Sequence, residues 1–358
     1  MSSVGATLQG SFSGETGTIT ETGFYYGTSA GNLPTKVAAA GTSSPFSKSI
    51  TGLTQGTTYY YKAYVIEDGE YRYGSESSFV TKYNWLEMPS YTTSAMSGTT
   101  TSSLSDLYKV THSAMMGGKT QRNYTMLYDP EMFASYWVAY PLCSAHLTTG
   151  RTESWAYDPA VPEGKQAKAK NGYGVSLSTT NYASNSWARG HQIPNADRNN
   201  VAEMQAQTYY YPNLTPQIQN GFNGGIWANL EGAVRSLCDN CDTVYVVTGA
   251  AFRKKGGSEA INTITDKKND GDVLPVPNYY WKVLLKVEWS GGLINNASAI
   301  GFWLPHADLK DESYSDSKYV VSVDQIETWT GFDFFVNLPT SLQSTAEANT
   351  NWSAFNSF

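Results

Sequence analysis

Histidine is scarce in this chain, and one of its four histidines has neighbours suited to acid–base chemistry. His191 follows Arg189 and Gly190 and precedes a polar segment that contains a proline, an unusual setting for a core histidine. A neutral imidazole with a pKa of about 6.5 can accept a proton at neutral pH, and an arginine keeps its charge there. Because a lone histidine is more often structural than catalytic, the assignment depends on the residues that follow.

Further along the chain, chemically useful side chains recur every four positions: Asn223, Trp227, Glu231 and Arg235. If this segment is helical throughout, steps of four place all of them on one broad face. An amide oxygen suits a hard divalent cation, and a guanidinium suits a phosphate. The alternative is an exposed Glu231–Arg235 ion pair, which stabilises a helix by only about 0.2–0.5 kcal/mol.

Together these segments resemble the DNA/RNA non-specific endonucleases, the ββα-metal (His-Me finger) nucleases with an Arg-Gly-His motif. The likeness runs through most of residues 84–340. Any one segment is a weak signal, whereas the ordered set is a strong one. The matching segments are 137–140, Arg151 ahead of Trp155 and 158–159, 187–198, 213–217, 222–235, 242–249, 277–283 and 326–331.

The resemblance implies a hydrolytic site. His191 would be the general base that takes a proton from the attacking water, and Asn223 would bind the divalent metal directly. Glu231 would hold water in the shell of the metal, which would be Mg²⁺ or alternatively Mn²⁺. The implied substrates are DNA and RNA, single- or double-stranded. A metal of this kind would stabilise the charge that develops on the phosphate and on the leaving 3′-oxygen.

The resemblance also implies supporting roles. Asn213 would support the loop that carries His191, although Pro212 replaces the serine usual before it, and Ala188 replaces the usual aspartate before Arg-Gly-His. The second departure bears on fine positioning near the arginine and not on the base itself. The arginines expected around the scissile phosphate are Arg151, Arg189 and Arg235.

Length and composition limit the class of protein. The 358 residues (39.2 kDa) suit two domains, and 26 Tyr, 10 Trp and only 15% charged residues do not describe a disordered chain. No apolar run approaches the roughly 18 residues that cross a bilayer. The net charge of −7 and pI of about 5.2 exclude a large basic face but not a local basic cleft. Basic clusters at 165–170, 253–255 and 267–268 are interpreted as solvated loops rather than as a positive rim.

Residues 1–82 are predicted to be all-β, because short strand-like segments alternate with Gly/Ser/Thr turns. Residues 50–65 resemble the fibronectin type III family, so we expect a β-sandwich that acts as a spacer or surface tether without chemistry of its own. Residues 83–358 form the predicted nuclease domain, with a flexible loop at 89–106. Its fold class is α+β, because strands and helices do not alternate regularly. The clearest strands are 244–249 and 279–287, and the clearest helices are 227–237 and 324–330.

Three cysteines allow at most one internal disulfide. Cys238 and Cys241 form a C-x-x-C, but no second pair completes a zinc site, so a surface disulfide or buried thiols are favoured. Which of Cys143, Cys238 and Cys241 pair is left open. The low content of charged residues and the abundance of Tyr, Thr, Ser and Asn favour a protein that works outside the cytoplasm, either secreted or at the cell surface. We expect that an export signal has already been removed from this sequence.

The leading hypothesis is an exported, metal-dependent endonuclease for DNA and RNA, with an N-terminal module and an unknown oligomeric state. A second hypothesis is a surface binding or adhesion protein whose nuclease-like domain has lost activity. A redox protein built on Cys238 and Cys241 ranks last, because it rests on one weak motif.

Overall fold

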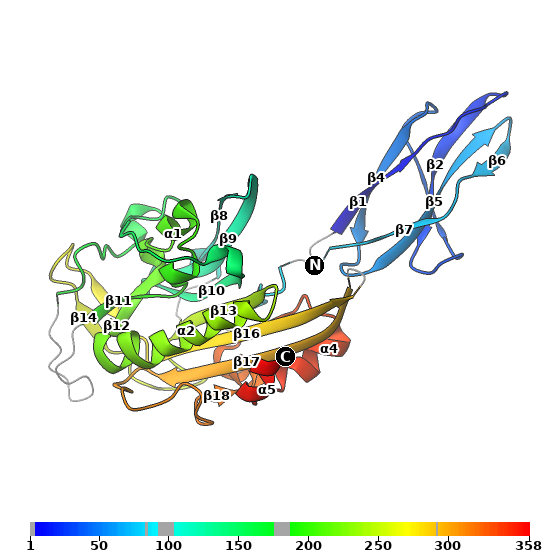
Figure 1. Cartoon of the computed structure of the whole chain (residues 1–358). Coiled ribbons are helices and arrows are strands. Elements are labelled where there is room, and N and C mark those ends of the chain that lie inside the picture. The colour runs from blue at the N-terminus through cyan, green and yellow to red at the C-terminus, as the bar shows by residue number, and fades with distance from the viewer. Residues whose placement is uncertain (1–3, 83–84, 92–103, 175–186, 291–292) are drawn as a thin grey trace. The chain divides into compact units, whose positions relative to one another are not determined.

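The computed structural model describes residues 4–82, 85–91, 104–174, 187–290 and 293–358 (Figure 1). Most of the predicted loop 89–106, namely residues 92–103, lies outside this description. The chain divides into two compact units with separate hydrophobic cores. The first unit comprises Met1–Trp85, Glu288–Asn296 and Asn337–Pro339, and the second comprises Leu86–Val287, Ala297–Val336 and Thr340–Phe358.

The N-terminal part of the first unit contains only strands, joined in two antiparallel sheets. One sheet pairs β1 with β4, and the other has the order β3-β2-β5-β6, with β7 paired to β5. Successive side chains of a strand point to opposite faces of its sheet. Tyr59 and Val65 of β5 therefore point into the core together with Phe24 of β2. The strands are β1 (Val4–Gly10), β2 (Ile19–Gly27), β3 (Thr35–Ala38), β4 (Phe46–Leu53), β5 (Thr58–Glu67), β6 (Glu70–Tyr73) and β7 (Ser77–Val80).

The second unit is built on a seven-stranded sheet with the order β18-β17-β16-β13-β10-β9-β8. β10 and β13 are antiparallel neighbours, and their register ends where Leu142 lies opposite Val244. Strands and helices do not alternate along the chain, so the predicted mixed α+β arrangement is what the structure shows. The sheet strands are β8 (Tyr108–Met116), β9 (Lys119–Asp129), β10 (Ala134–Leu142), β13 (Val244–Ala251), β16 (Tyr279–Ser290), β17 (Leu293–Pro305) and β18 (Val320–Val321).

Both faces of this sheet are covered. Figure 1 shows α2 (Ala228–Ser236) lying along β13 and β16, and its Leu230 shares a core with Val246 and Leu284 of those strands. On the other face, the ring of Trp281 packs 5.2 Å from that of Phe334. Burial on both faces explains why these strands are almost continuously apolar in sequence.

The smaller elements surround the sheet. The predicted strands 244–249 and 279–287 and the predicted helices 227–237 and 324–330 are present as β13, β16, α2 and α3. The short helices α1, α4 and α5 gave no clear periodic signal and were not predicted. These elements are α1 (Ala202–Gln207), α3 (Val323–Thr330), α4 (Thr340–Glu347), α5 (Trp352–Ser357), β11 (Trp187–His191), β12 (Leu214–Ile218), β14 (Thr263–Thr265) and β15 (Val273–Pro275).

The structure also bears on the cysteines and on membranes. Cys143, Cys238 and Cys241 are free thiols, and burial raises the pKa of Cys238 to about 12. A thiol with a raised pKa is a poor nucleophile, which counts against the redox hypothesis. Within the described parts of the chain, every helix is too short or too polar to span a bilayer.

Candidate active site

His191 is positioned by a pair of antiparallel strands. β11 pairs with β12 so that His191 lies opposite Leu214 and Trp187 lies opposite Ile218. Trp187, Leu214 and Ile218 belong to the main core of the second unit, so the strand pair is anchored at both ends. The wound segment η6 (Gln219–Trp227) and then helix α2 follow directly, which gives a strand–strand–helix arrangement.

The imidazole of His191 is enclosed by aromatic rings. Its centroid lies 5.5 Å from that of Trp155 and 5.2 Å from that of Tyr209. The Nε2 atom is buried and has no hydrogen-bond partner among the described residues. Burial, together with the charges of Arg151 and Arg189, lowers the pKa of His191 to about 3, although a backbone hydrogen bond with Arg189 opposes this shift. At neutral pH the ring is therefore uncharged, with a nitrogen lone pair available to accept a proton.

Two of the predicted arginines share this neighbourhood. The guanidinium of Arg189 lies 3.7 Å from the ring centroid of Trp155, and its Nη1 donates to the carbonyl of Lys170 at 2.7 Å. Arg151 is about half exposed and lies 6.0 Å from the ring centroid of Tyr209. The aromatic pair that encloses His191 thus also carries the two cations on which a phosphate could bind.

Asn223 is tied to the strand pair by Gln217. A Cβ atom at position 190 would collide with the side chain of Gln217, so only glycine lets Gln217 cross over β11 next to His191. The Oε1 atom of Gln217 accepts a hydrogen bond from Nδ2 of Asn223 at 2.6 Å. This contact leaves Asn223 Oδ1 without a hydrogen-bond donor among the described residues, on a half-buried side chain. A free, oriented amide oxygen is a ligand that a hard cation can use.

The prediction that Asn223, Trp227, Glu231 and Arg235 share one helix face is wrong for Asn223, whereas the other three lie at steps of four along α2 and its N-cap. Segment η6 contains non-helical backbone angles at Asn220, Gly221 and Gly225, and the regular helix α2 begins only at Ala228. Gly221 adopts a φ of 78°, a left-handed conformation that glycine takes without strain. The glycines of this segment therefore let the chain bend, so that Gln217 and not a helix sets the direction of Asn223.

Glu231 lies on α2 against the sheet. Burial raises the pKa of its carboxyl group, and the nearby charge of Lys282 opposes that rise. Burial lowers the pKa of Lys282, whose Nζ donates to Thr248 Oγ1 at 3.0 Å and lies 4.3 Å from the ring of Trp227. Lys282 was not identified from the sequence, because its role depends on a strand that packs beneath the helix.

Arg235 is engaged in an ion pair. Its Nη1 lies 2.9 Å from Oδ1 of Asp197, and the other carboxylate oxygen accepts a hydrogen bond from Tyr140 at 2.8 Å. Among the described residues it forms no hydrogen bond or ring contact with the Trp155–Tyr209 pair. The sequence predicts three arginines around one phosphate, and in the structure Arg235 is paired with Asp197, whereas Arg151 and Arg189 lie against Tyr209 and Trp155.

Asn213 braces the chain after His191. It is fully buried, and its Oδ1 accepts from the backbone N–H of Ile193 at 3.0 Å. Its Nδ2 donates to the carbonyls of Ile193 and Thr208 at 3.0 and 2.7 Å. Pro212 does not disturb this arrangement, because its carbonyl accepts a hydrogen bond from Ser135.

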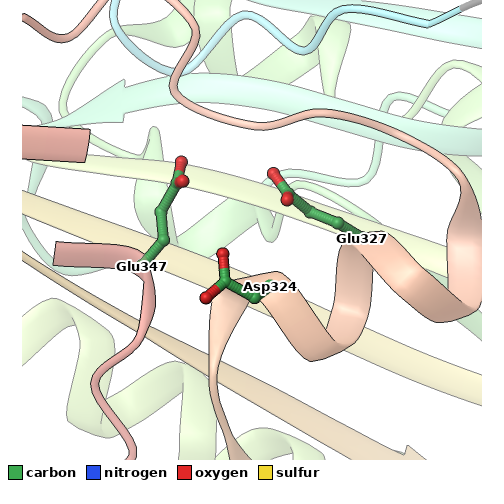
Figure 2. A group of neighbouring side chains, drawn as sticks. All are labelled: Asp324, Glu327 and Glu347. Atoms are coloured by element: carbon green, nitrogen blue, oxygen red, sulfur yellow. The ribbon is translucent and has the colours of Figure 1, made fainter. Parts of the chain in front are cut away.

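A group of carboxylates elsewhere was not identified from the sequence. Figure 2 shows Asp324 and Glu327 of α3 converging on Glu347 of α4, with one oxygen of each within 4.8 Å of the others. Burial raises the pKa of Glu327 to about 7 and that of Glu347 to about 8. Gln343 and the backbone N–H of Phe334 donate to this group. Carboxyl groups that retain protons can lie together without a metal.

Several side chains of the basic clusters already have partners within the protein. Lys168 lies 3.5 Å from Asp270, and Arg253 donates to the carbonyl of Glu259. The Nζ of Lys254 lies 3.7 Å from the ring centroid of Trp329. These partners agree with the interpretation of solvated or packed loops.

An unpaired neutral imidazole beside two arginines, on a strand–strand–helix element, is an arrangement suited to hydrolysis of a phosphodiester. The chain belongs to the DNA/RNA non-specific endonuclease family, whose sequence model matches residues 103–341. It is similar to a nuclease of Syncephalastrum racemosum, 29% identical over 66% of this chain and 73% of the relative. A nuclease of Serratia marcescens is 30% identical over 59% of this chain and 72% of the relative. The crystal structure of the EndoG/EndoGI complex gives a TM-score of 0.49 with 20% identity, covering 64% of this chain and 88% of that one.

The family resemblance stated from the sequence is therefore confirmed, and the chain is a hydrolase that acts on nucleic acids. The likeness of residues 50–65 to fibronectin type III stays a prediction.

Proposed function

We propose that the chain is a metal-dependent endonuclease that hydrolyses phosphodiester bonds in both DNA and RNA. The observation that carries this proposal is the buried, unpaired Nε2 of His191 beside Arg151 and Arg189. Family membership supports the substrate class.

His191 acts as the general base. Its Nε2 accepts a proton from the water that attacks phosphorus, and general-base catalysis of this kind contributes roughly 10²–10⁴ in rate. The lowered pKa keeps the ring uncharged, and Trp155 and Tyr209 restrict its orientation. Asn213 acts as a positioning residue by fixing the chain that leaves β11.

The side chains fit a hard divalent cation. Asn223 offers a free amide oxygen whose direction is set by Gln217, and the carboxylate of Glu231 is suited to hold water beside the ion. Oxygen ligands with retained waters suit Mg²⁺, or alternatively Mn²⁺. When bound, the cation supplies Lewis-acid stabilisation of charge on the phosphate and on the leaving 3′-oxygen.

Arg151 and Arg189 bind the phosphate. Phosphate contacts position a nucleic acid without reading its sequence, so a site of this kind accepts any base order and either sugar. The ion pair of Arg235 with Asp197 supports a structural role for Arg235, in which it ties α2 to the short helix 195–197, whose Asp197 also accepts from Tyr140 of β10.

Location is proposed from composition. The low charge and the abundance of Tyr, Thr and Ser support work outside the cytoplasm. A relative from Schizosaccharomyces pombe is named as a mitochondrial nuclease. A surface tether through the N-terminal module is part of the same proposal.

The test is incubation of the purified chain with supercoiled plasmid and with RNA, in Mg²⁺ and in EDTA, beside His191→Ala. We expect metal-dependent degradation of both substrates and its loss in the variant, with an unchanged circular dichroism spectrum. Cleavage by His191→Ala at the parental rate would show that another group is the base. Absence of cleavage in Mg²⁺, Mn²⁺ and Ca²⁺ would favour the inactive binding protein.

A further inference from the structure

The outward-facing side of the sheet β3-β2-β5-β6 is unusually rich in tyrosine. The strand register places these residues on one face, because Tyr25 pairs with both Lys36 and Lys62, and Tyr64 pairs with Tyr73. The core residues of the same strands, such as Phe24 and Val65, point the other way. We call this surface the tyrosine face; its residues are Tyr25, Lys36, Lys62, Tyr64, Tyr71 and Tyr73.

The rings form a continuous platform. Tyr71 and Tyr73 stack with centroids 5.8 Å apart and planes inclined by 14°, and they are 41% and 52% exposed. Tyr64 lies 5.7 Å from Tyr71, and Tyr25 lies 6.0 Å from Tyr73. Gly23 leaves room for this platform, because a Cβ atom there would collide with the ring of Tyr64. Large aromatic side chains held together and open to solvent mark an interaction surface more often than isolated ones do.

Lysines lie among the rings. The Nζ of Lys62 is 4.5 Å from the ring centroid of Tyr73, and among the described residues Lys62 forms no ion pair. The Nζ of Lys36 is 4.8 Å from Tyr64 and donates to the hydroxyl of Tyr71 at 2.9 Å. The carboxylate of Glu21 is neutralised by Lys36 at 2.8 Å and also accepts from Tyr64. The face therefore combines exposed rings with one cation, Lys62, that has no ion pair among the described residues.

We propose that the tyrosine face binds a single strand of nucleic acid, with bases stacked on Tyr71 and Tyr73 and a phosphate on Lys62. Stacking platforms with interleaved cations bind single strands without base selection, because every base has a π-face. The choice of nucleic acid over a neutral glycan rests on the cation Lys62 and on the proposed function. The N-terminal module would then retain substrate rather than act only as a spacer.

The test measures binding without cleavage. The full chain carrying His191→Ala is titrated in EDTA and low salt against a fluorescein-labelled oligothymidylate, and anisotropy gives the Kd. We expect Tyr71→Ala with Tyr73→Ala to weaken binding roughly tenfold or more, the loss expected for removed base stacking. Tyr73→Phe keeps the ring and should bind as the parent does. Lys62→Ala should also weaken binding. Lys82→Ala is the matched control, because Lys82 is an exposed lysine beyond β7, and it should leave the Kd unchanged.

Hydrogen exchange locates the contact independently. Adding the oligonucleotide should protect the backbone of β5 and β6 in the parent and not in the double alanine variant. Parental affinity in that variant, together with unchanged exchange in β6, would overturn the proposal. Tyrosine-dependent binding of cellohexaose, with oligothymidylate binding unaffected, would overturn it in favour of a glycan.

The two proposals fail separately. If the parent cleaves plasmid and the tyrosine variants bind like the parent, only the binding face is refuted. If the parent cleaves nothing but oligothymidylate binding depends on Tyr71 and Tyr73, the endonuclease proposal falls and the binding face stands.

Discussion

Two regions of the second unit bury titratable groups, and in both the burial favours the uncharged form of those groups. At the first, burial and the cations Arg151 and Arg189 depress the pKa of His191. At the second, burial raises the pKa of Glu327 and Glu347. The difference lies in what the neutral form offers: His191 has an unpaired acceptor atom, while Glu347 accepts from Gln343 and retains its proton. A displaced pKa therefore marks burial, and only the unpaired atom marks a candidate for catalysis.

The hydrogen bond between Gln217 and Asn223 gives the largest expected effect. Gln217→Ala should raise the Mg²⁺ concentration for half-maximal cleavage roughly 10- to 100-fold, the range for losing a group that orients a metal ligand. Cleavage rates measured across a Mg²⁺ series provide the check. Gln121→Ala, an exposed glutamine on β9, is the matched control and should leave the requirement unchanged. An unaltered requirement in Gln217→Ala would mean that Asn223 is oriented by something else.

The carboxylate group should make stability depend on pH. Because the folded pKa of Glu347 is about 8, above the ordinary 4.5, the folded state binds its proton more tightly than the unfolded state. This stability is fully present below about pH 4.5 and is lost as pH rises toward 8. Between pH 5 and 7, the parent's free energy of unfolding should fall by about 2 kcal/mol more than that of Glu347→Gln, at about 1.36 kcal/mol per pH unit.

Urea denaturation followed by tryptophan fluorescence at several pH values measures this slope. Glu347→Gln should leave plasmid cleavage intact, in contrast to His191→Ala. Asp324→Asn serves as the exposed control and should change the slope less. Equal slopes for the parent and Glu347→Gln would show that the group does not retain a proton.

The pH profile of cleavage gives the smallest expected effect. Because the folded pKa of His191 is lowered, the base stays neutral well below pH 6.5, and the acidic limb of kcat/KM should lie at least about one unit lower. Arg151→Gln removes a nearby cation and should move that limb upward. A limb at or above pH 6.5 in the parent would contradict the lowered pKa.

The sequence singled out the segments 187–198 and 213–217 by their motifs, and the structure pairs them as β11 and β12. These two strands were not predicted, because each is too short to show a clear alternation of apolar and polar residues. The helix-face prediction for Asn223 failed because spacing alone ignores glycines that bend the chain. Periodicity assumes a regular helix, and Gly221 and Gly225 remove that assumption.

Long-range partners could not be predicted in the same way. Arg235 and Asp197 meet because α2 packs against the short helix 195–197, and the charge of Lys282 acts on Glu231 from a strand far along the chain. Asp324 and Glu347 likewise lie on separate helices. No local pattern encodes such contacts, since they follow from tertiary packing.

The pairing of Leu142 with Val244 has a consequence for how this site can evolve. All the candidate site residues, from Arg151 to Arg235, lie on chain that leaves the sheet at Leu142 and returns at its direct neighbour. The candidate site therefore lies on one continuous segment of chain between two adjacent strands, and the sheet holds the two ends of this segment together. Lengthening such a segment costs little, because each doubling of its length adds only about 0.6 kcal/mol to the entropic cost of closing the loop. Insertions could therefore reshape substrate contacts while the sheet keeps its register.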